Sequence, residues 1–147
     1  MPRSLIKDFD IRFFVHATED PEKVLDATHS IIPYQYRSKI RFRKRKLKGA
    51  YKNPILLYET KINEQEILDS ILENMSSNLS SIEKGRLQEE FQKMVDGSKM
   101  YLRFDKQESF KGRLILCSGD PIHIRIRFRT KDCSEIQKKI RSFGLIS

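Results

Sequence analysis

Apolar and polar residues alternate at several points along the chain, a pattern typical of strands that bury one face. The alternation is clearest near the C-terminus, where the apolar set is Ile122, Ile124, Ile126 and Phe128. Near the N-terminus the corresponding set is Phe9, Ile11, Phe13 and Val15. The pattern predicts six strands, over residues 7–17, 38–47, 55–62, 100–104, 112–117 and 122–129.

Apolar residues at a spacing of three to four predict four helices. These run from Asp20 to Pro33, from Asn63 to Met75, from Ser81 to Gly97 and from Asp132 to Gly144. The first has a clear start, because the Asp20 side chain can accept hydrogen bonds from free backbone N–H groups. Residues 63–66 resemble a capping box for the second helix, and the polar segment 76–81 is expected to be a turn.

The predicted order is strand, helix, two strands, two helices, three strands and a final helix. Helices separated in this way from neighbouring strands predict an α+β fold, with one largely antiparallel sheet and helices packed on one of its faces. At 147 residues the chain has the size of one ordinary domain, so residues 1–147 are expected to form a single domain. Ile40 and Phe42 of the second strand are expected in its core.

Positive charge is concentrated in one segment. No acidic residue lies between Asp26 and Glu59, while this stretch holds nine cations: Arg37, Lys39, Arg41, Arg43, Lys44, Arg45, Lys46, Lys48 and Lys52. These nine account for the whole net charge of +9, because the remaining Lys and Arg equal the 20 Asp and Glu in number. A local excess of this kind produces a focused field that attracts a polyanion, so the segment predicts binding to nucleic acid.

Lys44 and Lys46 fall on the same face of the second strand as Ile40 and Phe42. Unpaired buried lysines are very costly, so the strand is expected to leave the core, twist or bulge at this point. Tyr51 follows the basic residues directly, and an exposed aromatic ring among cations can stack on an unpaired base. Packing of Tyr51 against its own hairpin is an equally good interpretation.

The last strand carries a second set of cations, Arg125, Arg127 and Arg129, on the face opposite its apolar residues. Residues of one parity stand about 6.5–7 Å apart along a strand, close to the repeat of a nucleic-acid backbone. We therefore include these three arginines among the expected RNA contacts. The alternative is an exposed face whose arginines are neutralised across the sheet by Asp8, Asp10 or Glu59.

Signals for other functions are weak. Cys117 and Cys133 are too few for a disulfide framework or a thiolate metal site, and no cofactor or metal motif is present. No apolar run is long enough to span a bilayer and no signal peptide begins the chain, so a cytoplasmic protein without membrane contact is expected. A nuclease would have to use Asp105, Lys106, Glu108 and His123, and we expect a protein that is not an enzyme.

Four stretches carry a family resemblance: residues 14–20 (Phe-Val-His-Ala-Thr-Glu-Asp), 53–55 (Asn-Pro-Ile), 101–107 (Tyr-Leu-Arg-Phe-Asp-Lys-Gln) and 120–123 (Asp-Pro-Ile-His). They resemble the archaeal RNA-binding family once called domain of unknown function 54, whose members have been described as predicted exosome subunits. The resemblance implies a fold similar to the ribosomal protein that binds 5S ribosomal RNA, RNA as the partner, and exosome or ribosomal proteins as further possible partners.

The chain departs from this family at residues 49–52. Relatives resemble Gly-His-Tyr/Phe-Gly at this point, whereas this chain has Gly-Ala-Tyr-Lys. An RNA contact made there would gain a cation and a stiffer backbone. Two alternatives to RNA binding stay open: a protein-interaction module that docks its basic face on an acidic partner, and the nuclease described above.

Overall fold

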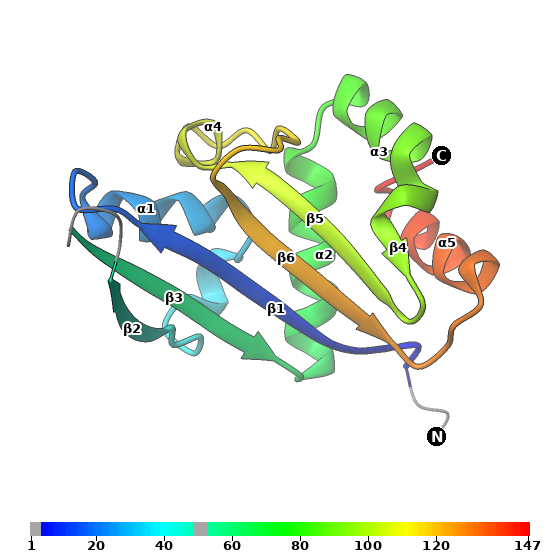
Figure 1. Ribbon diagram of the computed structural model, residues 1–147. Helices are drawn as coiled ribbons and strands as arrows, with labels where there is room; N and C mark the ends of the chain where they lie inside the picture. The colour runs from blue at the N-terminus through cyan, green and yellow to red at the C-terminus, as the bar shows by residue number, and fades with distance from the viewer. Residues whose placement is uncertain (1–3, 49–52) are drawn as a thin grey trace.

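The computed structural model describes residues 4–48 and 53–147. Its strands form one six-stranded antiparallel sheet in the order β2-β3-β1-β6-β5-β4, which crosses the centre of Figure 1. The strands are β1 (Ile6–Val15), β2 (Arg43–Lys48), β3 (Pro54–Ile62), β4 (Val95–Asp96), β5 (Lys99–Asp105) and β6 (Pro121–Phe128). Tyr51 and Lys52, expected to contact RNA, lie outside the described residues.

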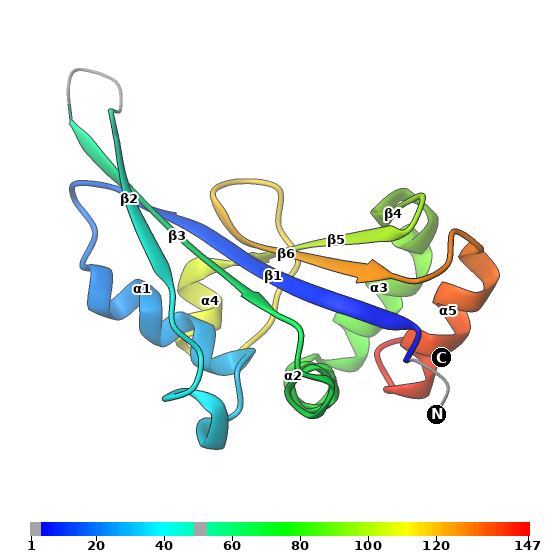
Figure 2. The ribbon, with the colours of Figure 1, turned by 90° about the horizontal axis from the view of Figure 1, so that it is seen from below.

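The helices gather on one side of this sheet, and the opposite side is open (Figure 2). They are α1 (Pro21–Ala27), α2 (Gln65–Asn78), α3 (Ser81–Met94), α4 (Lys106–Phe110) and α5 (Cys133–Ser142), with 3-10 turns at Thr28–Ser30 and Tyr34–Tyr36. The predicted α+β class and the single layer of helices are therefore confirmed.

The core lies between the sheet and the helices. Phe9, Ile11 and Phe13 of β1 are fully buried, as are the inward residues of β6. Ile40 and Phe42, expected in the core, are only partly buried. They precede β2, because the backbone N–H groups of residues 39 and 40 bond to the carbonyl of Tyr36 in a turn and delay the strand to Arg43.

The predicted strand over residues 112–117 is wrong. This segment has a single bridge, between Phe104 and Leu116, and no ladder. Ends of helices take part in holding it, since Leu114 N–H donates to the carbonyl of Asn78 and Leu116 N–H donates to the carboxylate of Glu83. Its alternating leucines are buried under these contacts. The short strand β4 and the five-residue helix α4 were not expected.

Two helix boundaries also differ from the prediction. The capping box at residues 63–66 does not form, because the N-cap of α2 is Glu64 and its side chain makes no capping bond. α2 continues to Asn78, so most of the expected turn 76–81 is helical. Ser80 is the N-cap of α3, and its hydroxyl accepts from Glu83 N–H at 3.2 Å. The cap expected at Asp20 is confirmed by its bond to Glu22 N–H at 3.0 Å.

Candidate nucleic-acid interface

The basic segment contains the edge strand β2, which pairs with β3 so that Arg43 lies opposite Glu59 and Lys48 opposite Pro54. The two strands extend beyond the helical layer, at the upper left of Figure 2. All six residues of β2 are exposed. The expectation that the strand leaves the core is therefore confirmed. Lys44 and Lys46 are in solvent, although their side chains lie on the parity that would be buried if β2 continued over the core.

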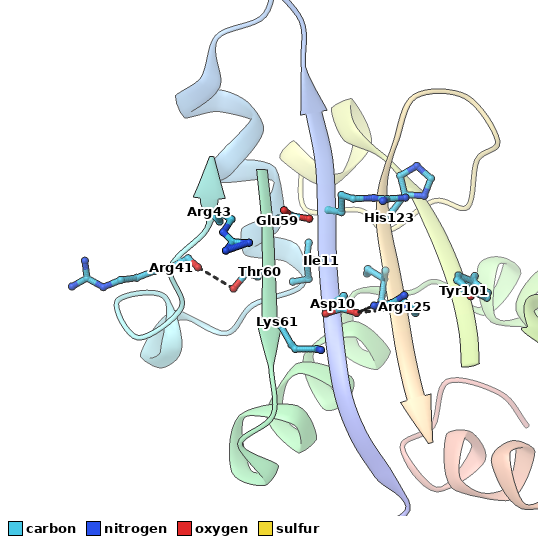
Figure 3. Close-up of a pocket in the computed structure, with 12 residues that line it drawn as sticks. Asp10, Ile11, Arg41, Arg43, Glu59, Thr60, Lys61, Tyr101, His123 and Arg125 are labelled. Atoms are coloured by element: carbon cyan, nitrogen blue, oxygen red, sulfur yellow. Dashed lines mark hydrogen bonds and ion pairs between the residues drawn. The ribbon is translucent and has the colours of Figure 1, made fainter. Parts of the chain in front are cut away.

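Few of the cations of β2 are neutralised. Arg45 Nε lies 3.4 Å from Glu59 Oε1. Arg43, Lys44, Lys46 and Lys48 make no ion pair with any residue that the structure describes. Just before the strand, the Arg41 side chain points away from the sheet edge, while its carbonyl accepts from Thr60 Oγ1 at 3.0 Å (Figure 3).

Arg37 and Lys39 are placed differently, around the 3-10 turn that precedes β2. Arg37 donates to the carbonyls of Ile32 and His29, both at 3.4 Å, and its guanidinium lies 5.3 Å from the centre of the Tyr34 ring. Lys39 Nζ lies 5.9 Å from the centre of another ring, that of Tyr36. Both cations therefore already have local contacts that the cations of β2 lack.

The three arginines of the last strand are engaged across the sheet. Arg125 donates to Asp10 and Arg127 donates in fork geometry to Asp8. Arg129 donates to the backbone carbonyls of residues 4 and 6. Neutralisation by the acids of β1, left open by the sequence, is thus what the structure shows for two of the three. Their role in RNA binding stays a prediction.

Asp8 is a buried carboxylate beneath the Arg127 guanidinium. Burial alone would raise the pKa of Asp8. The hydrogen bonds and charge of Arg127, helped by Lys61 and Lys7, outweigh burial and hold the pKa of Asp8 below its ordinary value. This pair is therefore a structural element of the sheet.

The open face also brings residues expected to bind RNA together with three that sequence reasoning missed as binding residues, Arg12, Lys61 and Tyr101. A hollow of about 500 Å³ is lined from the β2 side by Arg41 and Arg43, in the middle by Arg12 and Lys61, and from the β5 side by Tyr101 (Figure 3). The signal was present in the alternation, since the polar residues of β1 and β5 had to face away from the helices. The alternation could not predict which strands lie side by side in the sheet.

His123, assigned by sequence only to a possible nuclease, lies on this open face. Its register partners are Arg12 on β1 and Arg103 on β5. Burial lowers the pKa of His123, the charges of Arg12 and Arg103 lower it further, and Asp120 opposes them. His123 is therefore neutral near pH 7, in a region of positive potential.

The other residues of the possible nuclease site have separate local contacts. Asp105 caps α4 by accepting from Glu108 N–H at 2.9 Å. Glu108 lies 3.8 Å from Lys111 Nζ. Lys106 is buried, donates to the carbonyl of Phe14, and lies on the helix side of β1. Asp105, Glu108 and Lys106 thus each already have a local structural partner.

Lys106 instead joins three of the four sequence stretches that carry the family resemblance. Its Nζ lies 3.3 Å from Glu19 Oε1 and 2.8 Å from Asp120 Oδ2, which also bonds to His16 Nε2 at 2.6 Å. The ligand atoms of His16, Glu19 and Asp120 lie within 4.8 Å of one another, a spacing that suits a metal ion. The ammonium group of Lys106 already offsets one of the two negative charges of these carboxylates, which weakens attraction for a divalent cation.

Comparisons with known proteins give matches to RNA-binding proteins. A family model described as RNA binding matches residues 8–128. An RNA-binding protein of Pyrococcus abyssi is 37% identical over 122 residues, which cover 81% of this chain and 79% of that protein. The residues matched by the family model include the basic segment and most of the sheet and of the helical layer.

Solved structures confirm the architecture. A protein of Archaeoglobus fulgidus from the former domain of unknown function 54 matches with a TM-score of 0.78 at 24% identity, over 94% of this chain and 99% of that chain. A protein of Sulfolobus solfataricus from the same former family gives a TM-score of 0.75 at 28% identity, over 92% and 98%. Within residues 4–48 and 53–147, no helix has the length and apolar character needed to cross a membrane.

Proposed function

This chain belongs to the RNA-binding family, and we propose that it is a non-catalytic RNA-binding protein that holds the phosphate backbone along β2 and the adjoining open face of the sheet. The observation that carries the proposal is the state of the β2 cations. Arg43, Lys44, Lys46 and Lys48 are exposed and, within the described residues, have no acidic partner. Charges kept free of internal partners are available to an external polyanion.

The geometry of the edge strand suits a backbone contact. Side chains of one parity on β2 recur about every 6.5–7 Å, so Arg43 and Arg45 form one line and Lys44 and Lys46 form a second on the opposite face. Because β2 extends beyond the helices, an RNA strand can reach both lines (Figure 2). Contacts of this kind fix position and orientation and are largely independent of base sequence.

The flanking residues have a smaller part in the proposal. Arg37 and Lys39 lie at the start of the basic segment, and Arg125, Arg127 and Arg129 extend the positive face toward β6. Paired arginines still contribute donors that their carboxylate partners leave free. We expect them to add less to affinity than the free cations of β2.

Partners beyond RNA rest on the family resemblance alone. An exosome or ribosomal protein would contact the same basic face. The proposed location of the protein, together with such partners, is the cytoplasm. The interaction-module alternative would require an acidic protein in place of RNA. It predicts weak RNA binding that does not saturate.

Ultraviolet cross-linking to RNA, followed by mass spectrometry of the cross-linked peptides, tests the proposal. We expect cross-linked peptides to cover residues 41–48 and strands of the open face. Cross-links confined to α2, α3 or α5 would contradict the proposed surface. Sequencing the RNA recovered from cells after the same treatment identifies the partner.

A further inference from the structure

Arg12, His123 and Arg103 form a row across the centre of the open face. Arg12 of β1 is the register partner of His123 of β6, and His123 is the partner of Arg103 of β5, so the three share one face of three adjacent strands. Adjacent strands lie about 4.8 Å apart, which separates the two arginine Cα atoms by roughly 10 Å. Two guanidinium groups on flexible stems can therefore meet above the imidazole ring.

This row carries positive charge that the protein itself does not neutralise. The open-face carboxylates of β1 and β3 are paired with other arginines: Asp8 with Arg127, Asp10 with Arg125, and Glu59, the register partner of Arg12, with Arg45. On β5, Asp105 shares the face of Arg103 but accepts from Glu108 N–H at the start of α4. The side chains of Arg12 and Arg103 are exposed and make no ion pair or hydrogen bond within the described part of the chain. Two unpaired guanidinium groups beside a nitrogen base suit an oxyanion such as a phosphate.

An exposed aromatic ring lies one step along β5 from this row. Tyr101 precedes Arg103 by two residues on the same face, about 6.5–7 Å away along the strand, and is 40% exposed. Its register partner is Arg125, whose charge is taken up by Asp10. A ring in this position can stack on a base while the neighbouring row holds the phosphate attached to the same nucleotide.

We propose that the row Arg12–His123–Arg103 binds one phosphate of an unpaired RNA segment and that Tyr101 stacks on the base attached to it. This inference rests on the proposed RNA-binding function and deepens it by naming the class of RNA. Bases in a duplex are already stacked and paired, so only unpaired nucleotides reach Tyr101. The hairpin would then hold the backbone, and the sheet would select for single strands.

His123 provides a direct report on occupancy of the site. The charged groups around it are Arg12 on β1, Arg103 on β5, Arg125 on its own strand and Asp120 in the loop before β6. A bound oxyanion offsets the two unpaired arginines, so it raises the pKa of His123 and favours the imidazolium ion. Protonated His123 donates an additional hydrogen bond to the anion, and binding strengthens as pH falls through this pKa.

Proton NMR titration of the three histidines tests the phosphate site. The probes are inorganic sulfate, which stays doubly charged over the range, and a short single-stranded oligouridylate, both at constant ionic strength. We expect both probes to raise the pKa of His123 while leaving that of His29, in the helical layer, unchanged. In the double variant Arg12→Gln, Arg103→Gln the pKa of free His123 should rise, and neither probe should shift it further. RNA that binds wild-type protein without moving His123 would overturn the inference.

Affinity measurements test the base site with a matched control. Tyr101→Ala should weaken single-stranded RNA binding roughly ten-fold and duplex binding very little, because only an unpaired base stacks on the ring. Tyr101→Phe keeps the ring and should bind as wild type does. All these side chains are exposed, so circular dichroism should show the variants folded. Equal losses for single-stranded and duplex RNA would contradict the stacking role.

A third variant separates this inference from the function on which it rests. Replacing Arg43, Lys44 and Lys46 with Gln removes free charge from β2 and leaves the row intact. If this variant loses RNA affinity while the Tyr101 and arginine variants keep it, the row is not a subsite and the proposed function stands. If none of the variants loses affinity, both fail. Losses in both sets support the two together.

Discussion

The salt dependence of RNA affinity gives the sharpest test of phosphate binding by the hairpin of β2 and β3. The variant used has Arg43, Lys44 and Lys46 changed to Gln. These three cations are exposed and, in the described residues, lack acidic partners, whereas Arg45 is spared so that Glu59 keeps its neighbour. Each phosphate contact on single-stranded RNA contributes about −0.7 to the slope of log K against log salt. If about six cations of the basic segment contact phosphates, the wild-type slope is roughly −4.

Removing three of these contacts should bring the slope to about −2. The same relation gives a loss in affinity of roughly 100-fold near 0.1 M salt. The loss shrinks as salt rises, because each released counterion gains less free energy in more concentrated salt. Fluorescence anisotropy of a labelled single strand, measured between about 0.05 and 0.4 M salt, gives both the slope and the affinity.

A variant with the same change in net charge provides the control. Lys23 of α1, Lys93 of α3 and Lys138 of α5 are exposed on the helical layer, and their replacement with Gln preserves helix propensity. We expect its slope to match that of wild type. A folded hairpin variant with unchanged slope and affinity would refute the reasoning, and equal losses in both variants would show that net charge, not the hairpin, sets the affinity.

Four further outcomes are expected from variants of the ion pairs made by Arg127, Lys106 and Arg125. Arg127→Met should lower the free energy of unfolding by about 3 kcal/mol in urea titrations, because it leaves Asp8 buried without its partner. The depressed pKa of Asp8 means that its contribution to stability is present above about pH 4 and is lost as pH falls through the lower folded pKa, so this acid-dependent loss should shrink in the same variant. Lys106→Met should lower the free energy of unfolding by about 2 kcal/mol. It should also raise the pKa of Asp120, because burial raises this pKa while Lys106 and His16 lower it below its ordinary value. NMR titration of the Asp120 carboxyl group measures the change. Arg125→Gln should weaken RNA binding less than three-fold in the anisotropy assay, a magnitude of about 0.6 kcal/mol typical of a cation already paired near a surface.

Local pattern was enough to predict much of the fold. The strands β1, β5 and β6 were predicted from alternation, because each has one face against the helices and one in solvent. β3 was also predicted as a strand. Residues 112–117 contain the apolar run Leu114–Cys117, which also suggested a strand, but the segment has a single bridge and is held in part by helix ends, so burial without a ladder imitated a strand. α4 has only five residues, too few to show a helical period.

The candidate site was only partly predictable for a different reason. Exposed charge on β2 follows from composition, since no acidic residue is near it in sequence. Whether Arg125 and Arg127 are free depends on β6 lying next to β1. Their paired residues are between 111 positions (Arg12 and His123) and 122 positions (Ile6 and Phe128) apart in sequence. The row of Arg12, His123 and Arg103 likewise exists only because β1, β6 and β5 are neighbours.

The two edges of the sheet are protected from unwanted strand addition in different ways. β4 has two residues and offers almost no backbone to another chain. β2 is longer, and within residues 4–48 and 53–147 no strand pairs with its outer edge, where its lysines and arginines repel a second copy. RNA bound along β2 as proposed would neutralise those charges and would itself cover the edge. Without RNA, the protein should therefore self-associate more readily when the cations of β2 are screened by salt or replaced. High salt should promote edge-to-edge pairing of the RNA-free protein.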